Sequence, residues 1–274
     1  MTIDAHQHFW KYRPQRDTWI TEEMETIRKD FLPENLQDLL HQNKIEGCVT
    51  VQVDQSEKET DFLIQCARNH SFIKGIVGWT DLRSTGVQAR LEYYYQFSEV
   101  KGFRHIVQSE PEGFLSRPDF CRGVALLEQY DFTYDILAYP KQLPSVLSFI
   151  KKFPNQKFVI DHLAKPFIRQ HQIKPWKQHI QQIAMHENVF CKISGMVTEA
   201  DWKSWKATDF SPYMETIWES FGPKRVLYGS DWPVCLLAAT YEKQFEIVRQ
   251  FISPFSPAEK KGILGENATR FYHL

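Results

Sequence analysis

The sequence predicts an α/β protein built as one (β/α)8 barrel, the TIM-barrel architecture, spanning residues 1–274. Eight short runs rich in β-branched and aromatic residues recur along the chain, and the stretches between them are long enough for a crossover helix. The length of 274 residues suits a closed barrel, which typically takes about 250 residues. An open doubly wound sheet normally has fewer strands, and no GxGxxG turn follows the first run. We therefore expect the closed barrel.

The expected strands and helices alternate from one end of the chain to the other. Alternation of this kind favours a parallel sheet covered by helices. The expected strands are Ile3 to His8, Cys48 to Val53, Ile76 to Thr80, Gly102 to Val107, Thr133 to Leu137, Phe158 to Leu163, Cys191 to Met196 and Val226 to Asp231. The clearest helical stretches are Glu57 to Asn69, Phe120 to Tyr130, Pro144 to Phe153, Ile173 to His186 and Ser211 to Phe221.

The composition favours a single domain of an ordinary globular enzyme. The chain is 42% apolar and 24% charged, which allows a core that needs no disulfide. No low-complexity tract, short repeat or Gly/Ser linker marks a second domain. The five cysteines are scattered and contain no CxxC pair, so neither a disulfide framework nor a zinc ribbon is indicated. These features fit the reducing cytoplasm.

Charge and hydropathy limit the kinds of partner. A net charge of −1 gives no broad attraction for nucleic acid or an acidic membrane, because such binding depends on concentrated Lys and Arg. No apolar run approaches the roughly 18 residues of a membrane span, and Asp4 and His6 lie too early for a cleavable signal peptide to precede them. Small neutral or anionic molecules are the expected partners, and the sequence leaves a homo-oligomer open.

The segment from Phe9 to Pro33 is longer than a usual connection between a strand and a helix. It contains several aromatic residues, among them Trp10 and Trp19. Two interpretations fit this composition, and both can hold together. The segment either covers a bound substrate or packs over the mouth of the barrel.

Ionisable residues near the ends of three expected strands indicate where the chemistry lies. In a parallel barrel, catalytic groups project from the C-terminal ends of the strands, where alternate residues face the interior. On this alternation Asp4, His6 and His8 share one face of the first strand, and two histidines at positions i and i+2 can converge on one ion or one oxygen. The same alternation, carried through the sixth and eighth expected strands, ends at His162 and Asp231.

Each of these residues also has a simpler explanation. A His-x-His pair arises by chance, His162 can be a hydrogen-bonded core histidine, and Asp231 before Trp232 can cap a turn. Taken together, however, the residues lie at strand ends that open onto one mouth. This joint placement favours a functional site.

Further candidates for substrate binding lie near the ends of the remaining strands. An ion pair or a rim contact would explain Arg104 and His105 without a substrate, and Asp135 and Lys192 fit a structural role equally well. The sequence does not fix which parity faces inward there. The candidates are Gln52 on the second strand, Arg104 or His105 on the fourth, Asp135 on the fifth, and Lys192 or Ser194 on the seventh.

Five motifs resemble the amidohydrolase superfamily, specifically its sugar-lactonase branch, which includes L-fuconolactonase, L-rhamnonolactonase and 2-pyrone-4,6-dicarboxylate lactonase. The resemblance runs nearly from end to end of the chain. The motifs are IDAHQHFW at Ile3 to Trp10, KGFRHIVQ at Lys101 to Gln108, VIDHLAKP at Val159 to Pro166, LYGSDWPV at Leu227 to Val234 and ILGENATRFY at Ile263 to Tyr272.

The resemblance implies a carboxylic ester hydrolase of carbohydrate catabolism that opens the ring of a small sugar-acid lactone, such as L-fucono- or L-rhamnonolactone. It also implies roles for particular residues. Asp231 would be the general base, and Arg104 and His105 would lie at the substrate. The histidine cluster would consist of His6, His8 and His162.

The metal requirement stays open at this point. Two-metal members of the superfamily bridge their ions with a carboxylated lysine or a glutamate on a central strand, and the expected fourth and fifth strands offer neither. His6, His8, His162 and Asp231 form a donor set that can hold a single Zn²⁺ at tetrahedral geometry. Some lactonases of the branch work without metal, so we expect either no cofactor or one divalent metal, Zn²⁺.

The expected mechanism uses the cluster to stabilise charge on the lactone carbonyl oxygen. Asp231 takes a proton from the attacking water and returns it to the departing ring oxygen. Arg104 grips hydroxyls or a carboxylate of the substrate. The tryptophans Trp10, Trp19 and Trp232 are expected to stack on the apolar face of a sugar ring.

Three other functions compete with this one. A zinc-dependent decarboxylase of the same superfamily would release carbon dioxide from an aromatic acid at a similar mouth. A metal-dependent DNase of related fold fits poorly with the near-neutral charge and the lack of a basic stripe. A catalytically silent barrel that binds sugar acids or a partner protein would have lost the acid–base and histidine set, which this sequence keeps.

Overall fold

The computed structural model describes residues 1–274 and contains an eight-stranded parallel sheet that closes into a barrel. The strands pair in chain order, and a parallel bridge between Gln7 and Trp232 joins the last strand to the first. The predicted (β/α)8 barrel is therefore confirmed. The strands are β1 (Ile3–Gln7), β2 (Gly47–Val51), β3 (Ile73–Gly78), β4 (Val100–His105), β5 (Thr133–Ile136), β6 (Phe158–Ile160), β7 (Val189–Ile193) and β8 (Val226–Tyr228).

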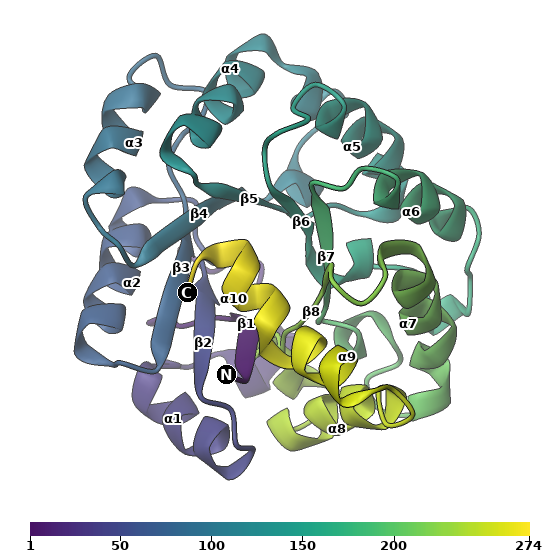
Figure 1. Cartoon of the computed structure of the whole chain (residues 1–274). Coiled ribbons are helices and arrows are strands. Elements are labelled where there is room, and N and C mark those ends of the chain that lie inside the picture. Colours follow the sequence, from purple (N-terminus) through teal and green to yellow (C-terminus); the bar gives the residue numbers. More distant parts are fainter.

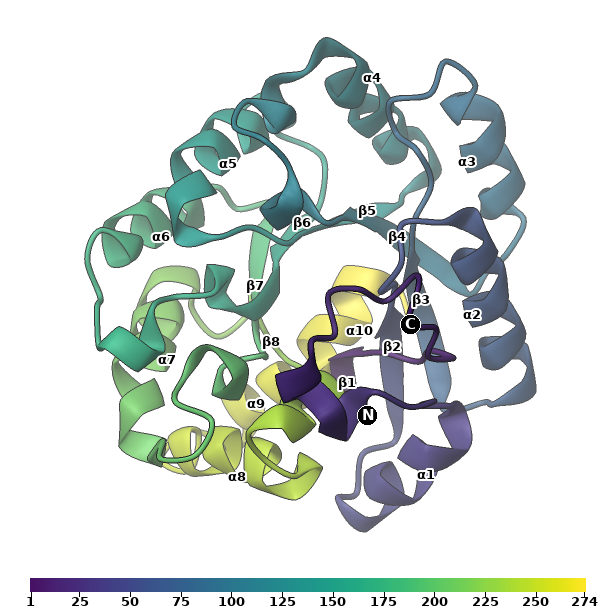
Figure 2. The ribbon, with the colours of Figure 1, turned by 180° about the vertical axis from the view of Figure 1, so that it is seen from behind.

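Helices surround the barrel, and one helix lies across the centre of the ring of strands (Figure 1). That helix is α10 (Asn267–Tyr272), which follows the short α9 (Pro257–Lys261). Figure 2, from the opposite side, shows the segment between β1 and α1 crossing in front of the strands. The outer helices are α1 (Pro33–Gln42), α2 (Glu57–Asn69), α3 (Val87–Tyr95), α4 (Pro118–Leu127), α5 (Leu143–Ile150), α6 (Trp176–Ala184), α7 (Ala207–Phe221) and α8 (Tyr241–Phe251).

The helices begin where local chemistry satisfies their first N–H groups. The Ser56 hydroxyl accepts from the backbone N–H of Glu59 at the start of α2, and Thr240 does the same for Lys243 in α8. Proline stands near the start of α1, where a missing N–H costs nothing. The predicted helix Glu57 to Asn69 coincides with α2 because both its cap and its apolar spacing are legible in the sequence.

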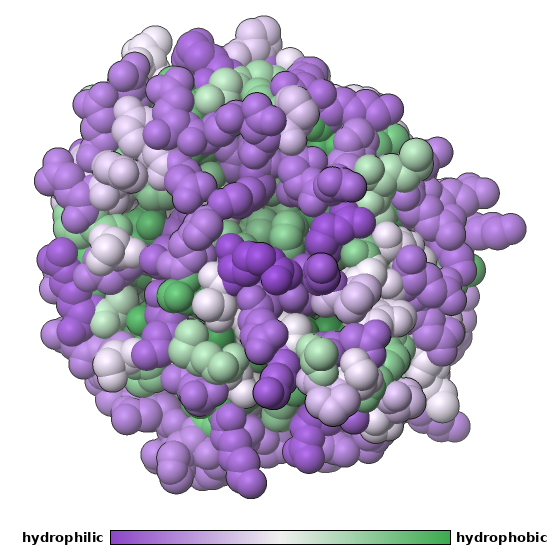
Figure 3. Space-filling model, in the orientation of Figure 1, coloured by the Kyte–Doolittle hydropathy of each residue, from purple (hydrophilic) through white to green (hydrophobic).

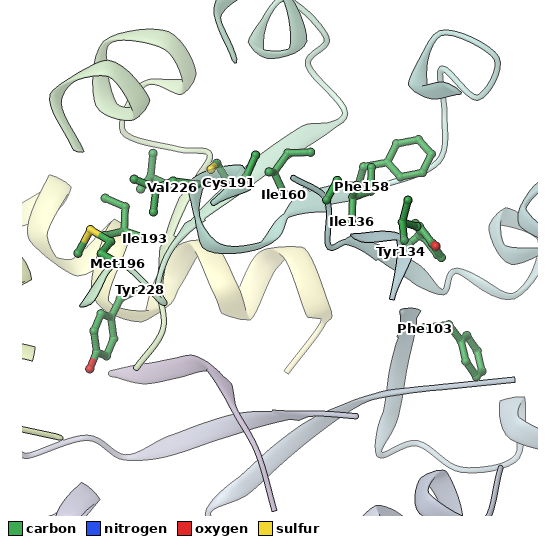
Figure 4. Close-up of a cluster of buried hydrophobic side chains, with 14 of the residues drawn as sticks. Phe103, Tyr134, Ile136, Phe158, Ile160, Cys191, Ile193, Met196, Val226 and Tyr228 are labelled. Atoms are coloured by element: carbon green, nitrogen blue, oxygen red, sulfur yellow. The ribbon is translucent and has the colours of Figure 1, made fainter. Parts of the chain in front are cut away.

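Apolar side chains pack on both faces of the sheet. Between the strands and the outer helices they form the larger core, part of which Figure 4 shows around β4 to β8, with Phe103, Tyr134 and Tyr228 among its members. Inside the barrel, Phe271 and Tyr272 of α10 pack against a small cluster that fills the N-terminal half. The rest of that inner cluster is Ile3, Ala5, Val49, Val51, Val77, Val159, Leu227 and Ala268.

The strands end earlier, and alternate less regularly, than the sequence predicted. In β1 the register shifts between Asp4 and Gln7, so that one extra residue stands opposite β2. Asp4 accepts a hydrogen bond of 3.0 Å from Tyr241 on α8, outside the sheet, whereas His6 contacts groups inside the barrel. The expectation that Asp4 and His6 share one face was therefore wrong, because a bulge re-aims the side chains that follow it.

The face in Figure 3 is mainly hydrophilic, with hydrophobic residues in small separate groups. None of the helices combines the length and the apolar character that a membrane span requires.

A buried carboxyl in α2 makes the stability of the fold depend on pH. Glu59 accepts hydrogen bonds from the backbone N–H groups of Val53 and Asp54, and its burial raises its pKa from 4.5 to about 8. Between about pH 4.5 and pH 8 the folded chain thus keeps a proton on Glu59 that the unfolded chain releases. The contribution of Glu59 to the free energy of unfolding is therefore fully present below about pH 4.5 and is lost as the pH rises towards 8.

We predict that the free energy of unfolding of the wild type falls relative to that of Glu59→Gln between pH 5 and pH 8. Urea denaturation at several pH values measures this difference. The exposed Glu219→Gln serves as the control and should run parallel to the wild type. Parallel curves for Glu59→Gln and the wild type would contradict the prediction.

Candidate active site

Four ionisable side chains meet at the C-terminal end of the barrel around a single carboxylate oxygen. Oδ1 of Asp231 lies 3.2 Å from Nε2 of His8 and 3.9 Å from Nε2 of both His6 and His162. All four side chains are buried. The structure thus brings together the four residues that the sequence placed at one mouth, although more than 200 residues separate the first of them from the last.

Two of these residues stand on left-handed backbone just beyond a strand. β6 ends at Ile160 and β8 at Tyr228, so the strand alternation that the sequence suggested does not reach His162 or Asp231. Their φ angles are 52° and 59°. Such a backbone costs a residue other than glycine about 1–2 kcal/mol and is held only by its surroundings. The structure therefore brings both side chains to the cluster, but the prediction that they lie on regular strands was wrong.

Glycines let the neighbouring strands approach these side chains closely. A Cβ at Gly229 would lie 2.6 Å from Cβ of His6, so only glycine lets β8 come this near to β1. Gly195, with a φ of 59°, faces His162, and a Cβ there would lie 2.5 Å from Nδ1 of His162. Both contacts fix the imidazoles from the side of the barrel wall.

The hydrogen bond of His8 defines which of its ring nitrogens has a free lone pair. Nδ1 lies 2.7 Å from the carbonyl oxygen of Val51, which can only accept, so Nδ1 carries the hydrogen. Nε2 is then the nitrogen that faces the Asp231 carboxylate, 3.2 Å away. Two acceptors so close together are stable when a proton or a metal ion lies between them. The ligand atoms of His6, His8 and Asp231 all lie within 4.8 Å of one another, as a shared ion would require.

A layer of buried charges supports His6 from below. Asp161 is its centre: Oδ1 lies 3.2 Å from Nδ1 of His6 and 3.0 Å from Nζ of Lys192. Oδ2 of Asp161 accepts from Arg104 at 3.0 Å. Lys192 also pairs with Asp135 at 2.5 Å. Two cations and two carboxylates therefore balance inside the barrel, which is how charges away from water avoid a large penalty.

The protonation states suit ligation and base chemistry. Burial lowers the pKa of His6 well below its ordinary value and that of His162 to about 4, so both rings are neutral near pH 7. Burial would raise the pKa of Asp231, but the neighbouring His162 and His8 outweigh it and the pKa is lowered. Neutral imidazoles beside an ionised carboxylate are the forms that bind a metal ion or accept a proton.

A cavity of about 440 Å³ opens from this cluster. His8, Arg104, His162 and Asp231 line it, and Trp19 joins them from the long segment after β1. That segment also packs into the core through buried residues such as Ile27, so the packing interpretation is confirmed, and the covering of a substrate stays a prediction. The remaining lining residues are Met24, Val53, Ile106, Gln108, Ser109, Leu137, Tyr139, Lys165, Thr198, Glu199, Trp202, Val234 and Leu237.

Of the three candidate tryptophans, Trp19 alone lines the cavity. Trp10 is buried, with Nε1 donating to the carbonyl of Lys29 at 2.9 Å. Trp232 is buried against Phe9 and Phe31. Trp10 and Trp232 therefore lie where they support the mouth of the barrel from behind.

Arg104 and His105 occupy opposite faces of β4. Arg104 reaches into the barrel, where Nη1 lies 3.4 Å from Nε2 of His6. His105 faces the helices, pairs with Glu110 at 2.7 Å and stacks on Phe114. Strand alternation separates these neighbours, and only Arg104 lines the cavity.

Gln52, Asp135 and Lys192 do not line the cavity either. Gln52 brackets Arg104: its carbonyl oxygen accepts from the Arg104 guanidinium, and its amide donates to the Arg104 carbonyl at 3.1 Å. Asp135 and Lys192 lie one layer deeper, where Tyr272 of α10 also donates to Asp135 at 2.8 Å. Ser194, the alternative to Lys192 on β7, lies 2.9 Å from Nδ1 of His162.

Sequence reasoning missed three charged residues of this region: Asp161, Lys165 and Glu199. Asp161 and Lys165 belong to the VIDHLAKP motif, in which only His162 was predicted to lie at the site. Val159 of β6 faces the inside of the barrel, and alternation along the chain places Asp161, two residues later, on the same side. Glu199 lies six residues after the end of β7 and belongs to none of the five motifs. Its place beside Lys165 therefore depends on the fold.

We predict that Asp161→Ala destabilises the fold by about 3–5 kcal/mol, because the buried positive charges of Arg104 and Lys192 then lose the carboxylate that they share. Chemical denaturation measures the effect. Asp119→Ala, which breaks an exposed pair with Arg117, is the matched control and should have little effect. Equal losses of unfolding free energy in the two variants would contradict the prediction, because the buried ion pairs would then stabilise the fold no more than an exposed pair does.

The sequence profile of the amidohydrolase family matches residues 3–274. An L-fucono-1,5-lactonase from Burkholderia multivorans is 36% identical over 286 aligned residues, which cover 100% of this chain and 96% of the relative.

Solved structures agree with this match. A crystal structure of an amidohydrolase from Burkholderia multivorans with bound zinc superposes with a TM-score of 0.97 at 36% identity, covering 100% of this chain and 99% of that one. A probable 2-pyrone-4,6-dicarboxylic acid hydrolase from Acinetobacter baumannii gives 0.81 at 18% identity, with 100% and 99% covered. The latter likeness shows the shared fold alone.

Proposed function

Since the chain belongs to the amidohydrolase family, as its motifs predicted, we propose that it hydrolyses the ring ester of a small sugar-acid lactone of the L-fucono- or L-rhamnonolactone type. The observation that carries this proposal is the meeting of three imidazoles with the Asp231 carboxylate; His8, His162 and Asp231 line the cavity, and His6 is buried next to them. The relative at 36% identity over its nearly full length is named as an L-fucono-1,5-lactonase, which supports a lactone over the aromatic acid of a decarboxylase.

Asp231 is the proposed general base. Its carboxylate is ionised and lines the cavity, so it is available to take a proton from a water molecule as that water attacks the lactone carbonyl. The same carboxyl then returns the proton to the ring oxygen as the ester opens. Since the alcohol stays attached to the acid chain, one carboxyl serves both steps.

His6, His8 and His162 are the groups proposed to face the carbonyl oxygen. Their rings lie together, with the centroid of His6 4.9 Å from that of His8 and 4.3 Å from that of His162, and the rings of His8 and His162 line the cavity. Arg104 stands beside His6 with a fixed positive charge, since Asp161 and Gln52 hold its guanidinium. It suits a role in orienting the substrate through hydrogen bonds, while Trp19 offers an aromatic surface.

The donor set also fits a single divalent metal ion. His8 directs a lone pair at Asp231, and Nδ1 of His6 lies beside Asp161, a carboxylate partner of the kind that orients metal-binding imidazoles. His6, His8, His162 and Asp231 would hold the ion. When bound, Zn²⁺ would polarise the carbonyl and lower the pKa of water. The family relative with bound zinc supports this assignment.

We further propose that residues 1–274 act as one domain in the cytoplasm on a small-molecule substrate. The family profile runs almost from end to end, and all five cysteines are free thiols, most of them buried. A reducing compartment keeps such thiols intact.

Proton release during a screen of aldonolactones tests the proposed reaction directly. Lactone opening liberates a proton near neutral pH, whereas decarboxylation tends to consume one. We expect acidification with a six-carbon aldonolactone and no pH rise with hydroxybenzoic acids. Alkalinisation with an aromatic acid, in the absence of lactone turnover, would establish the decarboxylase instead.

We predict that Asp231→Asn lowers turnover by about 100-fold or more, because it keeps the size of the side chain and removes the base. Steady-state kinetics measure the loss, with circular dichroism to confirm folding. Asp209→Asn, on the outer helix α7, is the control. Turnover near that of the wild type would remove Asp231 from this role.

We predict that the purified protein contains about one equivalent of zinc per chain and loses activity on chelation, because the donor set matches that ion. Elemental analysis and assays before and after chelation measure both quantities. Zinc added back should restore the rate. Full activity in a metal-free sample would leave the imidazoles to act without an ion.

A further inference from the structure

A second pair of charged residues lines the cavity apart from the histidine–aspartate cluster. Nζ of Lys165 lies 3.0 Å from Oε1 of Glu199, and both side chains line the cavity wall. Their exposed fractions are 18% and 22%, so the pair is reachable from the cavity without being an open surface contact. The cluster and the mechanism proposed for it make no use of this pair.

Lys165 ends a run of left-handed backbone that begins at His162. His162, Leu163, Ala164 and Lys165 all have positive φ angles, between 49° and 58°. Four such residues in a row are unfavourable without glycine and persist only when their surroundings enforce them. Here Leu163 and Ala164 are fully buried, and Trp176 donates to the carbonyl of Leu163 at 2.7 Å. One strained turn therefore places His162 in the cluster and Lys165 in the wall.

The charges that line the cavity are paired in a way that disfavours an anionic substrate. Arg104 is balanced by Asp161, and Lys165 by Glu199. A ligand carboxylate at this part of the wall would find the Lys165 ammonium already engaged and the Glu199 carboxylate beside it, whether or not the histidine cluster holds an ion. A neutral ligand meets no such penalty.

An ammonium and a carboxylate side by side offer a donor next to an acceptor. A hydroxyl group can accept from the first, and a neighbouring hydroxyl can donate to the second. Two adjacent hydroxyls on one ring satisfy both at once without adding charge. The aromatic ring of Tyr139, 5.8 Å from Nζ, limits the space beside the ammonium.

We propose that Lys165 and Glu199 determine specificity by binding two adjacent hydroxyls of a neutral, polyhydroxylated lactone, and that the pair selects against lactones that carry a carboxylate. This inference rests on the proposed lactone hydrolysis and defines its substrate class. It assigns to Lys165 and Glu199 a role in recognition, distinct from the proton transfer at Asp231.

The test compares three lactones: a polyhydroxylated six-membered aldonolactone, the unsubstituted δ-valerolactone, and a six-membered lactone with a carboxylate substituent. Lys165→Met should lower kcat/KM for the aldonolactone by about 10- to 100-fold, mainly through KM, because a charge-assisted hydrogen bond is lost. Its effect on δ-valerolactone should stay within about threefold, since that ring has no hydroxyl to bind. Lys165→Arg keeps the charge and should retain part of the preference.

Glu199→Gln frees the Lys165 charge and should raise kcat/KM for the carboxylated lactone relative to the aldonolactone. Lys177→Met, which removes one member of the surface pair Lys177 and Glu219, is the control and should change none of the three rates. Equal losses on aldonolactone and δ-valerolactone, or no loss on either, would overturn the inference while leaving the hydrolase function intact. A wild type inactive on all three lactones would overturn the proposed function itself.

Discussion

The return of β8 to β1 is the constraint on which the site depends. Asp231 donates its backbone N–H to the carbonyl of His6 at 2.8 Å, and His8 donates to that of Trp232 at 2.7 Å, so the first and last strands hold each other beside the cluster. Gly229 makes the approach sterically possible. The carboxylate therefore reaches three imidazoles only because the sheet closes, and any fold that left an open edge at β1 would separate them.

The barrel interior is divided into layers with different physical tasks. At the N-terminal end, α10 covers an apolar cluster whose burial favours folding. Above it lies the charge layer around Asp161 and Lys192, which is stable because each charge faces a partner of opposite sign. The imidazoles and Asp231 follow, and then the cavity. This order seals the barrel from below, while His8, His162 and Asp231 line the cavity above.

Several residues of the site hold positions that an isolated peptide would avoid. The left-handed turn from His162 to Lys165 and the positive φ of Asp231 are held by buried neighbours and backbone hydrogen bonds. Charges without water add to this cost. A large, closed core can hold such unfavourable backbone conformations and buried charges. In return, the side chains point in directions that regular strands do not provide.

The sequence by itself determined the order of strands and helices, the closed barrel and the four residues of the cluster, because periodicity and strand-end chemistry are local and because the motifs resemble a known family. The tertiary structure alone decided the rest. The bulge in β1 separated Asp4 from His6, and alternation turned His105 away from Arg104. Trp10 and Trp232 became buried while Trp19 reached the cavity, and Lys165 met Glu199 across a distance of 34 residues. Each of these outcomes depends on contacts between segments far apart along the chain, and such contacts leave no pattern in a short stretch of sequence.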